Sequence, residues 1–253
     1  MNRSCGVSLA ATLLALPSAA LAYRPFDSTD AAVADEGQIE IELGPLGFLR
    51  EGGNRWLVAP SVILNWGFAP RWELVLEGRQ FVRLANAGSE PRLRVDDAAL
   101  SLKSVLREGA LQEKDGVSVA AEVGALMPGI NGESGAGIQG AVIASQRWVA
   151  ATLHLNVAAA WTRAHERGLF GGVIAEGHDS WALRPVAEVF VEGESGTPTL
   201  FSGLAGAIWR VRDDLSLDAA IRLARAGQTD TFEVRAGLTW GFAAGFPAAG
   251  RKP

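Results

Sequence analysis

Residues 231–242 read TFEVRAGLTWGF, and their side chains alternate between two kinds. The apolar set is Phe232, Val234, Ala236, Leu238, Trp240 and Phe242. The small or polar set is Glu233, Arg235, Gly237, Thr239 and Gly241. Successive side chains of a β-strand point to opposite faces, whereas a helix needs apolar spacings of three and four. The stretch therefore predicts a strand with one apolar and one polar face.

The same period of two recurs along most of the chain. We expect about twelve strands, each near the roughly ten residues that a tilted strand needs to cross a membrane. The predicted strands are 38–48, 55–66, 72–83, 96–106, 117–127, 137–146, 150–162, 169–177, 183–192, 199–210, 215–225 and 231–242. Pro45 interrupts the first and the eighth is rich in glycine, so a ten-stranded barrel is the alternative.

The N-terminus has the layout of a secretory signal. Arg3 precedes a short apolar run, 7–16, and Pro17 ends that run before the small residues Ala20 and Ala22. We expect cleavage after Ala22, so residues 1–22 are a signal peptide. The one cysteine, Cys5, lies inside this signal. The mature chain is therefore expected to have no disulfide, no Cys-ligated metal and no lipid anchor.

Composition narrows the fold class. Hydrophobic residues make up 48% of the chain, yet no later segment has the roughly 18 uninterrupted apolar residues of a membrane helix. A large soluble core is one explanation, and a barrel that faces lipid is the other. The alternation favours a transmembrane antiparallel up-and-down β-barrel over 23–242, followed by a tail, 243–253. The net charge of −5 argues against a nucleic-acid partner.

The predicted connections differ in length in a regular way. Short turns such as 68–71, 146–149 and 211–214 alternate with Gly-rich polar links such as 85–94 and 129–137. Short periplasmic turns and longer outer loops are usual in bacterial barrels, with both termini in the periplasm. The link 107–116 departs from this rule, because it is long and falls on the periplasmic side.

Tryptophans fall near the predicted strand ends, where aromatic girdles of membrane barrels lie. Trp56 and Trp66 are expected to bracket one apolar face, and a packed soluble core is the alternative. The eight tryptophans are Trp56, Trp66, Trp72, Trp148, Trp161, Trp181, Trp209 and Trp240.

Charged residues should face the lumen, because each charge facing lipid at mid-membrane costs about 2–4 kcal/mol. Mixed charges can pair and close the lumen, or they can line a narrow wet path and set its selectivity. We expect a filled or constricted lumen. The lumen-lining candidates are Glu73, Glu77, Arg79, Arg83, Glu122, His154, Glu188, Asp218, Arg222, Glu233 and Arg235.

Catalytic and metal chemistry have little support in the sequence. His178-Asp179-Ser180 has the His-x-Ser spacing of the outer-membrane phospholipase barrel, but Asp-Ser is also common in turns. The three histidines lack a metal-ligand spacing, and there is no phosphate-binding glycine loop. We therefore expect no enzyme activity, no metal and no cofactor.

Two stretches resemble known barrels. Residues 238–242, LTWGF, resemble the closing strand of outer-membrane proteins, whose aromatic residue the barrel-assembly machinery reads, although here a tail follows. Residues 67–74, GFAPRWEL, and 184–190, RPVAEVF, resemble the family named for the MetA pathway of phenol degradation, a group of outer-membrane transporters.

The resemblance implies the outer membrane of a Gram-negative bacterium, with membrane lipid, the assembly machinery and a small organic solute as partners. The first functional hypothesis is a narrow channel or transporter for small organic solutes. A structural or envelope-maintenance barrel with a closed lumen is the alternative, and a lipid-modifying hydrolase comes third.

Overall fold

The computed structural model describes residues 24–84 and 91–244, and this part of the chain is almost entirely β-strand. The expected signal peptide and nearly all of the expected tail lie outside these residues. The elements are β1 (Gln38–Glu51), β2 (Asn54–Ala69), β3 (Trp72–Arg83), β4 (Leu93–Arg107), the short 3₁₀ helix η1 (Ala110–Gln112), β5 (Ser118–Leu126), β6 (Gly137–Arg147), β7 (Ala151–Trp161), β8 (Arg167–Gly177), β9 (Leu183–Glu194), β10 (Leu200–Arg212), β11 (Leu215–Ala226) and β12 (Thr229–Ala243).

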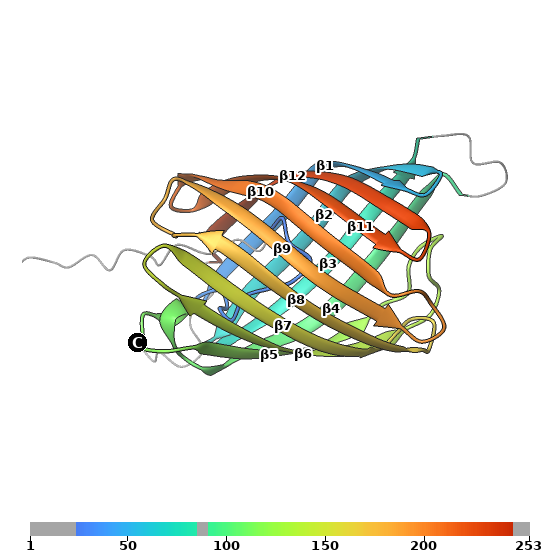
Figure 1. The fold of residues 1–253 in the computed structure, drawn as a ribbon. Helices are drawn as coiled ribbons and strands as arrows, with labels where there is room; N and C mark the ends of the chain where they lie inside the picture. Colours follow the sequence, from blue (N-terminus) through green and yellow to red (C-terminus); the bar gives the residue numbers. More distant parts are fainter. Residues whose placement is uncertain (1–23, 85–90, 245–253) are drawn as a thin grey trace, which may run out of the picture.

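The strands form one closed barrel in which every strand pairs antiparallel with its neighbours in sequence (Figure 1). β1 and β12 close the ring, with Ile41 opposite Trp240 and Phe48 opposite Val234. The predicted twelve-stranded up-and-down barrel is confirmed, and the interrupted first strand and the Gly-rich eighth are both present. Among the described residues no helix is long and apolar enough to span a membrane.

The two ends of the barrel differ in their connections. We call the end where β1 begins and β12 finishes the terminal end, and the opposite end the loop end. Links 70–71 and 213–214 at the terminal end are two-residue turns, but the link from β4 to β5 is long and contains η1. At the loop end, the links after β1 and β11 are also short, and Gly52 and Gly227 supply their positive φ angles.

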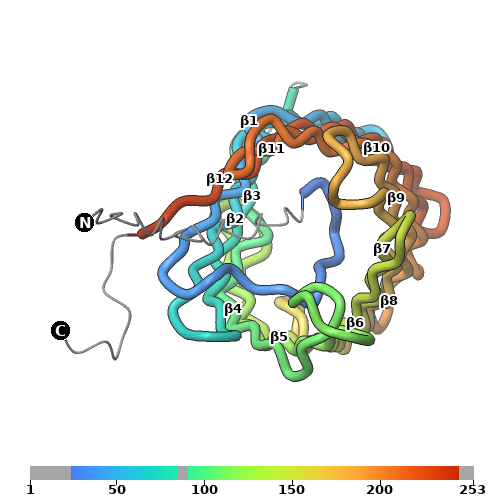
Figure 2. Tube along the Cα trace, turned by 90° about the vertical axis from the view of Figure 1, so that its left-hand side faces the viewer, coloured from blue at the N-terminus to red at the C-terminus, as the bar shows by residue number. Residues whose placement is uncertain are grey.

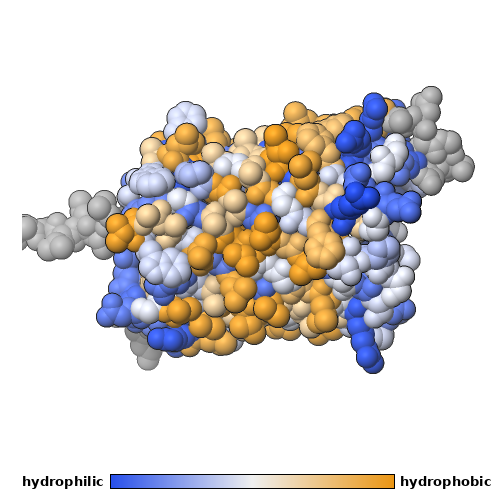
Figure 3. All heavy atoms as spheres, viewed as in Figure 1, coloured by the Kyte–Doolittle hydropathy of each residue, from blue (hydrophilic) through white to orange (hydrophobic). Residues whose placement is uncertain are grey.

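The outer wall carries a belt of exposed apolar side chains (Figure 3). Val157 on β7, Val189 on β9 and Ile221 on β11 are each more than half exposed to the exterior. Hydrophilic side chains gather toward the two ends of the barrel in the same view. An apolar band between two polar rims is the surface of a barrel that spans a bilayer.

The inner wall carries many buried polar and charged side chains. Its most buried side chains include Glu42, Lys103, Glu188 and Glu233, each at most 2% exposed. In a membrane barrel, lipid-facing and lumen-facing residues alternate along each strand, so the wall buries these charges inside.

Trp56 does not share the outer face with Trp66 as expected, because β2 contains a β-bulge between them. The β2–β3 register shifts between Val58 and Ser61, next to Pro60, which has no N–H for the ladder. One extra residue reverses which face the following side chains occupy. Trp56 therefore packs inside the barrel, 6% exposed, in a cluster with Leu49, Val58 and Phe81 rather than in an outer girdle with Trp66.

Candidate functional site

The residues that precede β1 lie inside the barrel. Figure 2 shows this stretch crossing the lumen within the ring of strands. We call residues 24–37 the lumen segment. Arg24, Asp30 and Ala31 are each at most 8% exposed, although the segment forms no strand. An extended chain without a ladder must find other partners for its backbone polar groups.

Those partners are side chains of the barrel wall. Six main-chain N–H groups of the lumen segment donate to side-chain oxygens of the wall, and four of these bonds end on carboxylates, where a charged acceptor strengthens them. The bonds are Arg24 N to Glu42 (3.0 Å), Asp27 N and Ser28 N to Glu188 (3.0 and 2.6 Å), Thr29 N to Asn156 (3.0 Å), Ala31 N to Ser145 (2.9 Å) and Ala34 N to Glu73 (2.6 Å).

Asp27 joins the lumen segment to an arginine cluster. Arg235 Nη2 lies 2.9 Å from both carboxylate oxygens of Asp27, and Arg235 Nη1 donates to the Pro25 carbonyl at 2.7 Å. Burial raises the pKa of the Asp27 carboxyl, but the Arg235 and Arg222 guanidinium groups outweigh it and hold that pKa below its usual value. Asp27 therefore pairs with Arg235 as a carboxylate.

Glu233 ties three arginines together beside Asp27. Its carboxylate accepts from Arg222 Nε at 2.9 Å and from Arg235 Nη2 at 2.9 Å, and it also accepts from Arg79 Nη2. Opposite charges thus meet across β3, β11 and β12.

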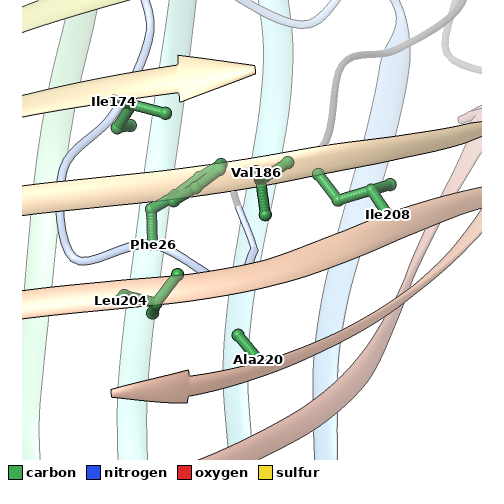
Figure 4. Close-up of a cluster of buried hydrophobic side chains, with 6 residues drawn as sticks. All are labelled: Phe26, Ile174, Val186, Leu204, Ile208 and Ala220. Atoms are coloured by element: carbon green, nitrogen blue, oxygen red, sulfur yellow. The ribbon is translucent and has the colours of Figure 1, made fainter. Parts of the chain in front are cut away.

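Phe26 anchors the lumen segment by apolar contact. It packs with Ile174, Val186, Leu204, Ile208 and Ala220, which project inward from β8, β9, β10 and β11 (Figure 4). Burying a phenylalanine side chain contributes roughly 1.5–3 kcal/mol.

A second polar cluster holds the middle of the lumen segment. Lys103 Nζ lies 3.6 Å from Asp30 and donates to Thr29 Oγ1 at 3.2 Å. Ser145, which receives the Ala31 N–H, is also 2.8 Å from His154 Nδ1.

The long terminal-end link, which contains η1, contacts the lumen segment. Gln112 of η1 donates to the Ala31 carbonyl at 3.0 Å, and Leu111 packs against the buried cluster that contains Ala31. This contact gives a physical reason for the one terminal-end link that broke the expected length rule.

A cavity of about 650 Å³ occupies the lumen beyond the lumen segment. Among the described residues that line it, acidic side chains outnumber basic ones by eleven to six. Within the described part of the chain, Glu77, Glu122 and Glu192 have no cationic side chain within 4.0 Å, whereas Arg79, Arg222 and Arg235 are all paired. Acidic side chains without a cationic partner are therefore in excess around this cavity.

The structure places all eleven lumen candidates on inward-facing positions, with Arg83 at the loop-end rim. Glu73, Glu188, Glu233 and Arg235 bond to the lumen segment or to its partners. Six others are Glu77, Arg79, Glu122 and Arg222, which line the cavity, and His154 and Asp218, which are buried inside.

Arg83 faces inward as well, at the loop end of β3 opposite Trp56. It donates to Asn54 Oδ1 at 2.8 Å, and its guanidinium carbon lies 4.9 Å from the Trp56 ring centroid.

The His178-x-Ser180 pair lies on an exposed turn at the terminal end. His178 Nδ1 is 2.7 Å from Ser180 Oγ, and the His178 ring also contacts Asp179. These contacts lie within three consecutive residues, as in an ordinary polar turn. The described residues contain no group of three or more His, Cys, Asp or Glu side chains that could hold a metal ion.

Sequence reasoning missed the residues of the lumen segment and several of their partners. Arg24, Phe26, Asp27 and Asp30 lie before the first predicted strand, where no periodicity distinguishes them from a loose terminus. One usable signal was the surplus of inward acidic side chains on the predicted strands, which requires donors from elsewhere.

Comparison with known proteins supports the fold. No family model matches the chain, and neither does any curated protein sequence. The chain is similar in structure to the COG4313 outer membrane channel from Pseudomonas putida F1, with a TM-score of 0.62 and 11% identity over 86% of this chain and 100% of that chain.

Two further solved structures share this architecture. The NanC porin aligns with a TM-score of 0.58 and 6% identity, over 80% of this chain and 98% of the porin. The KdgM porin, solved in complex with disordered oligogalacturonate, aligns with a TM-score of 0.51 and 8% identity, over 81% and 99%. At these identities the likeness shows the fold alone.

Proposed function

We propose that the protein is an outer-membrane channel for small solutes and that the lumen segment closes it from the terminal end. The observation that carries this proposal is a polar lumen with an open cavity on one side and a docked peptide on the other. A purely structural barrel needs neither an unfilled cavity nor a separate segment that is hydrogen-bonded inside the lumen.

The outer-membrane location rests on the apolar belt and on the shared fold of the solved channels. Processing after Ala22 is part of the same proposal. It leaves Arg24 as the second residue of the mature chain, so the lumen segment begins next to the mature N-terminus. The terminal end then faces the periplasm, as in other barrels with both termini there.

The solute class is proposed more narrowly from two sources. The stretches 67–74 and 184–190 resemble the MetA-pathway family of phenol degradation, which implies small organic solutes. Membership in that family is itself a proposal that rests on these short stretches. A cavity of about 650 Å³ is of a size to hold such a molecule.

The alternative is a structural barrel with a permanently closed lumen. The charge-assisted bonds to the lumen segment and the Glu233–arginine cluster favour it, since both fill the cross-section. A hydrolase has weaker support, because His178 and Ser180 lie on an exposed terminal-end turn with no neighbouring cavity residue.

Liposome swelling separates the channel from the structural barrel. The mature protein without residues 24–37 is reconstituted and tested with uncharged solutes of increasing size. A channel gives swelling rates that fall steadily with solute size. No swelling with any solute, from protein that shows heat-modifiable migration and is therefore folded, would favour the structural barrel.

A further inference from the structure

The Arg24 guanidinium occupies a shaped pocket in the lumen wall. Nη1 donates to Ser61 Oγ at 2.8 Å, Nε donates to Asp218 Oδ2 at 3.3 Å, and Nη2 donates to the Ala236 carbonyl at 3.3 Å. The acceptors come from β2, β11 and β12, so all three guanidinium nitrogens have a partner on the wall. The Arg24 and Asp218 side chains are 10% and 2% exposed.

Two glycines make room for this cation. A Cβ on Gly237 would lie 2.3 Å from Arg24 Nε and 2.7 Å from its Cζ. A Cβ on Gly44 would lie 2.7 Å from Arg24 Nη1 and 2.2 Å from Ser61 Oγ. Neither glycine has a positive φ, so the backbone does not require glycine at these positions. The space that they leave is filled by the guanidinium group.

The pocket communicates with the cavity on the loop side. Arg24, Gly44, Ser61 and Ala236 all line that cavity. A small solute that enters from the loop end can therefore reach the guanidinium without first displacing the rest of the lumen segment.

We propose that this pocket is a guanidinium-binding site of the lumen, filled by Arg24 in the closed state and available to small guanidinium compounds. The proposal rests on the proposed function only where it says that displacement of Arg24 opens the channel. The planar fork of a guanidinium fits three acceptors spread around it, whereas an ammonium group is a compact point charge.

Competition with Arg24 sets the expected affinities. Arg24 is tethered next to its pocket, and a short tether gives an effective concentration in the millimolar range. A free guanidinium compound must exceed that concentration to compete in the wild type. Removing the Arg24 side chain removes the competitor and leaves the acceptors in place.

Calorimetry in detergent tests the site with methylguanidinium as the probe and methylammonium as the control. Arg24→Ala should bind methylguanidinium at least about tenfold more tightly than the wild type does, and about tenfold more tightly than it binds methylammonium. In the Arg24→Ala background, Gly237→Ala should abolish binding by placing a methyl group in the pocket. Asp218→Asn is a second, nearly isosteric variant that should weaken binding about tenfold if Gly237→Ala does not fold.

Equal binding of the two probes by Arg24→Ala would overturn the site, as would undiminished binding after Gly237→Ala or Asp218→Asn. Single-channel recording tests the displacement step, because methylguanidinium should raise the open fraction of the wild type and methylammonium should not. Binding without this increase would overturn displacement alone. Failure of the segment-free barrel to conduct would overturn the channel and leave the calorimetric result standing.

Discussion

Arg235 on β12 holds Asp27 of the lumen segment through a nitrogen that lies 2.9 Å from both carboxylate oxygens. The same guanidinium bonds Glu233 and the Pro25 carbonyl. It is therefore the wall residue that connects the lumen segment to the arginine cluster.

Arg235→Ala should loosen the lumen segment and destabilise the barrel. Removing one partner of a buried ion pair leaves an uncompensated charge and typically costs about 3–5 kcal/mol. The free energy of unfolding, measured by urea titration in detergent, should fall by about this amount, and single-channel conductance should rise. Arg225→Ala is the matched control, because Arg225 is exposed at the loop end, and it should leave both quantities unchanged.

Variants of Glu188 and Glu192 test two roles separately: docking of the lumen segment and lining of the cavity. Glu188 accepts two N–H groups of the lumen segment, whereas Glu192, two inward positions further along β9, lines the cavity. Glu188→Ala leaves two amides without acceptors, at about 1–3 kcal/mol each, and should increase the open fraction in bilayer recordings. Glu192→Ala should leave the open fraction unchanged, and a similar rise for both variants would contradict docking through Glu188.

Neighbouring positions on β7 test which face meets lipid. Val157 is 57% exposed on the outer wall, and Ala158 lines the cavity. Val157→Arg should lower the free energy of unfolding by about 2–4 kcal/mol, because the charge faces lipid near mid-membrane. Ala158→Arg places the same charge in the cavity and should cost much less. Equal losses on refolding into lipid vesicles would show that the wall does not face the bilayer as described.

The unpaired acidic side chains of the cavity predict cation selectivity. Glu122 lines the cavity without a cationic partner within 4.0 Å among the described residues. A salt gradient across a bilayer should give a cation-selective reversal potential, which Glu122→Gln should reduce. Asp230→Asn, at an exposed loop-end position, is the control and should leave the potential unchanged. An anion-selective wild type would contradict this assignment.

The strands were predictable because their cause is local. In residues 231–242 each side chain meets either lipid or lumen, so the pattern itself records the two environments. Trp56 was wrongly assigned because the bulge beside Pro60 shifts the register, and a strictly periodic reading carries no such shift.

The lumen segment was not predictable in the same way. Its partners lie far away in sequence, as with Arg235 and Asp27 or Asn156 and Thr29, and its main-chain N–H and C=O groups make most of its hydrogen bonds to the wall. Amides carry no sequence signature. The only sequence signal of the interaction lies on the wall strands. Inward carboxylates such as Glu188 accept from donors that are not on neighbouring strands.

The central claim is that residues 24–37 close the lumen, and single-channel conductance tests it most directly. The account predicts small, rare openings for the intact mature protein and a larger, steady conductance once residues 24–37 are removed. A synthetic peptide with the sequence RPFDSTDAAVADEG should then block the shortened protein when added at the terminal end. Equal conductance of the two proteins, with no block by the peptide, would contradict the account.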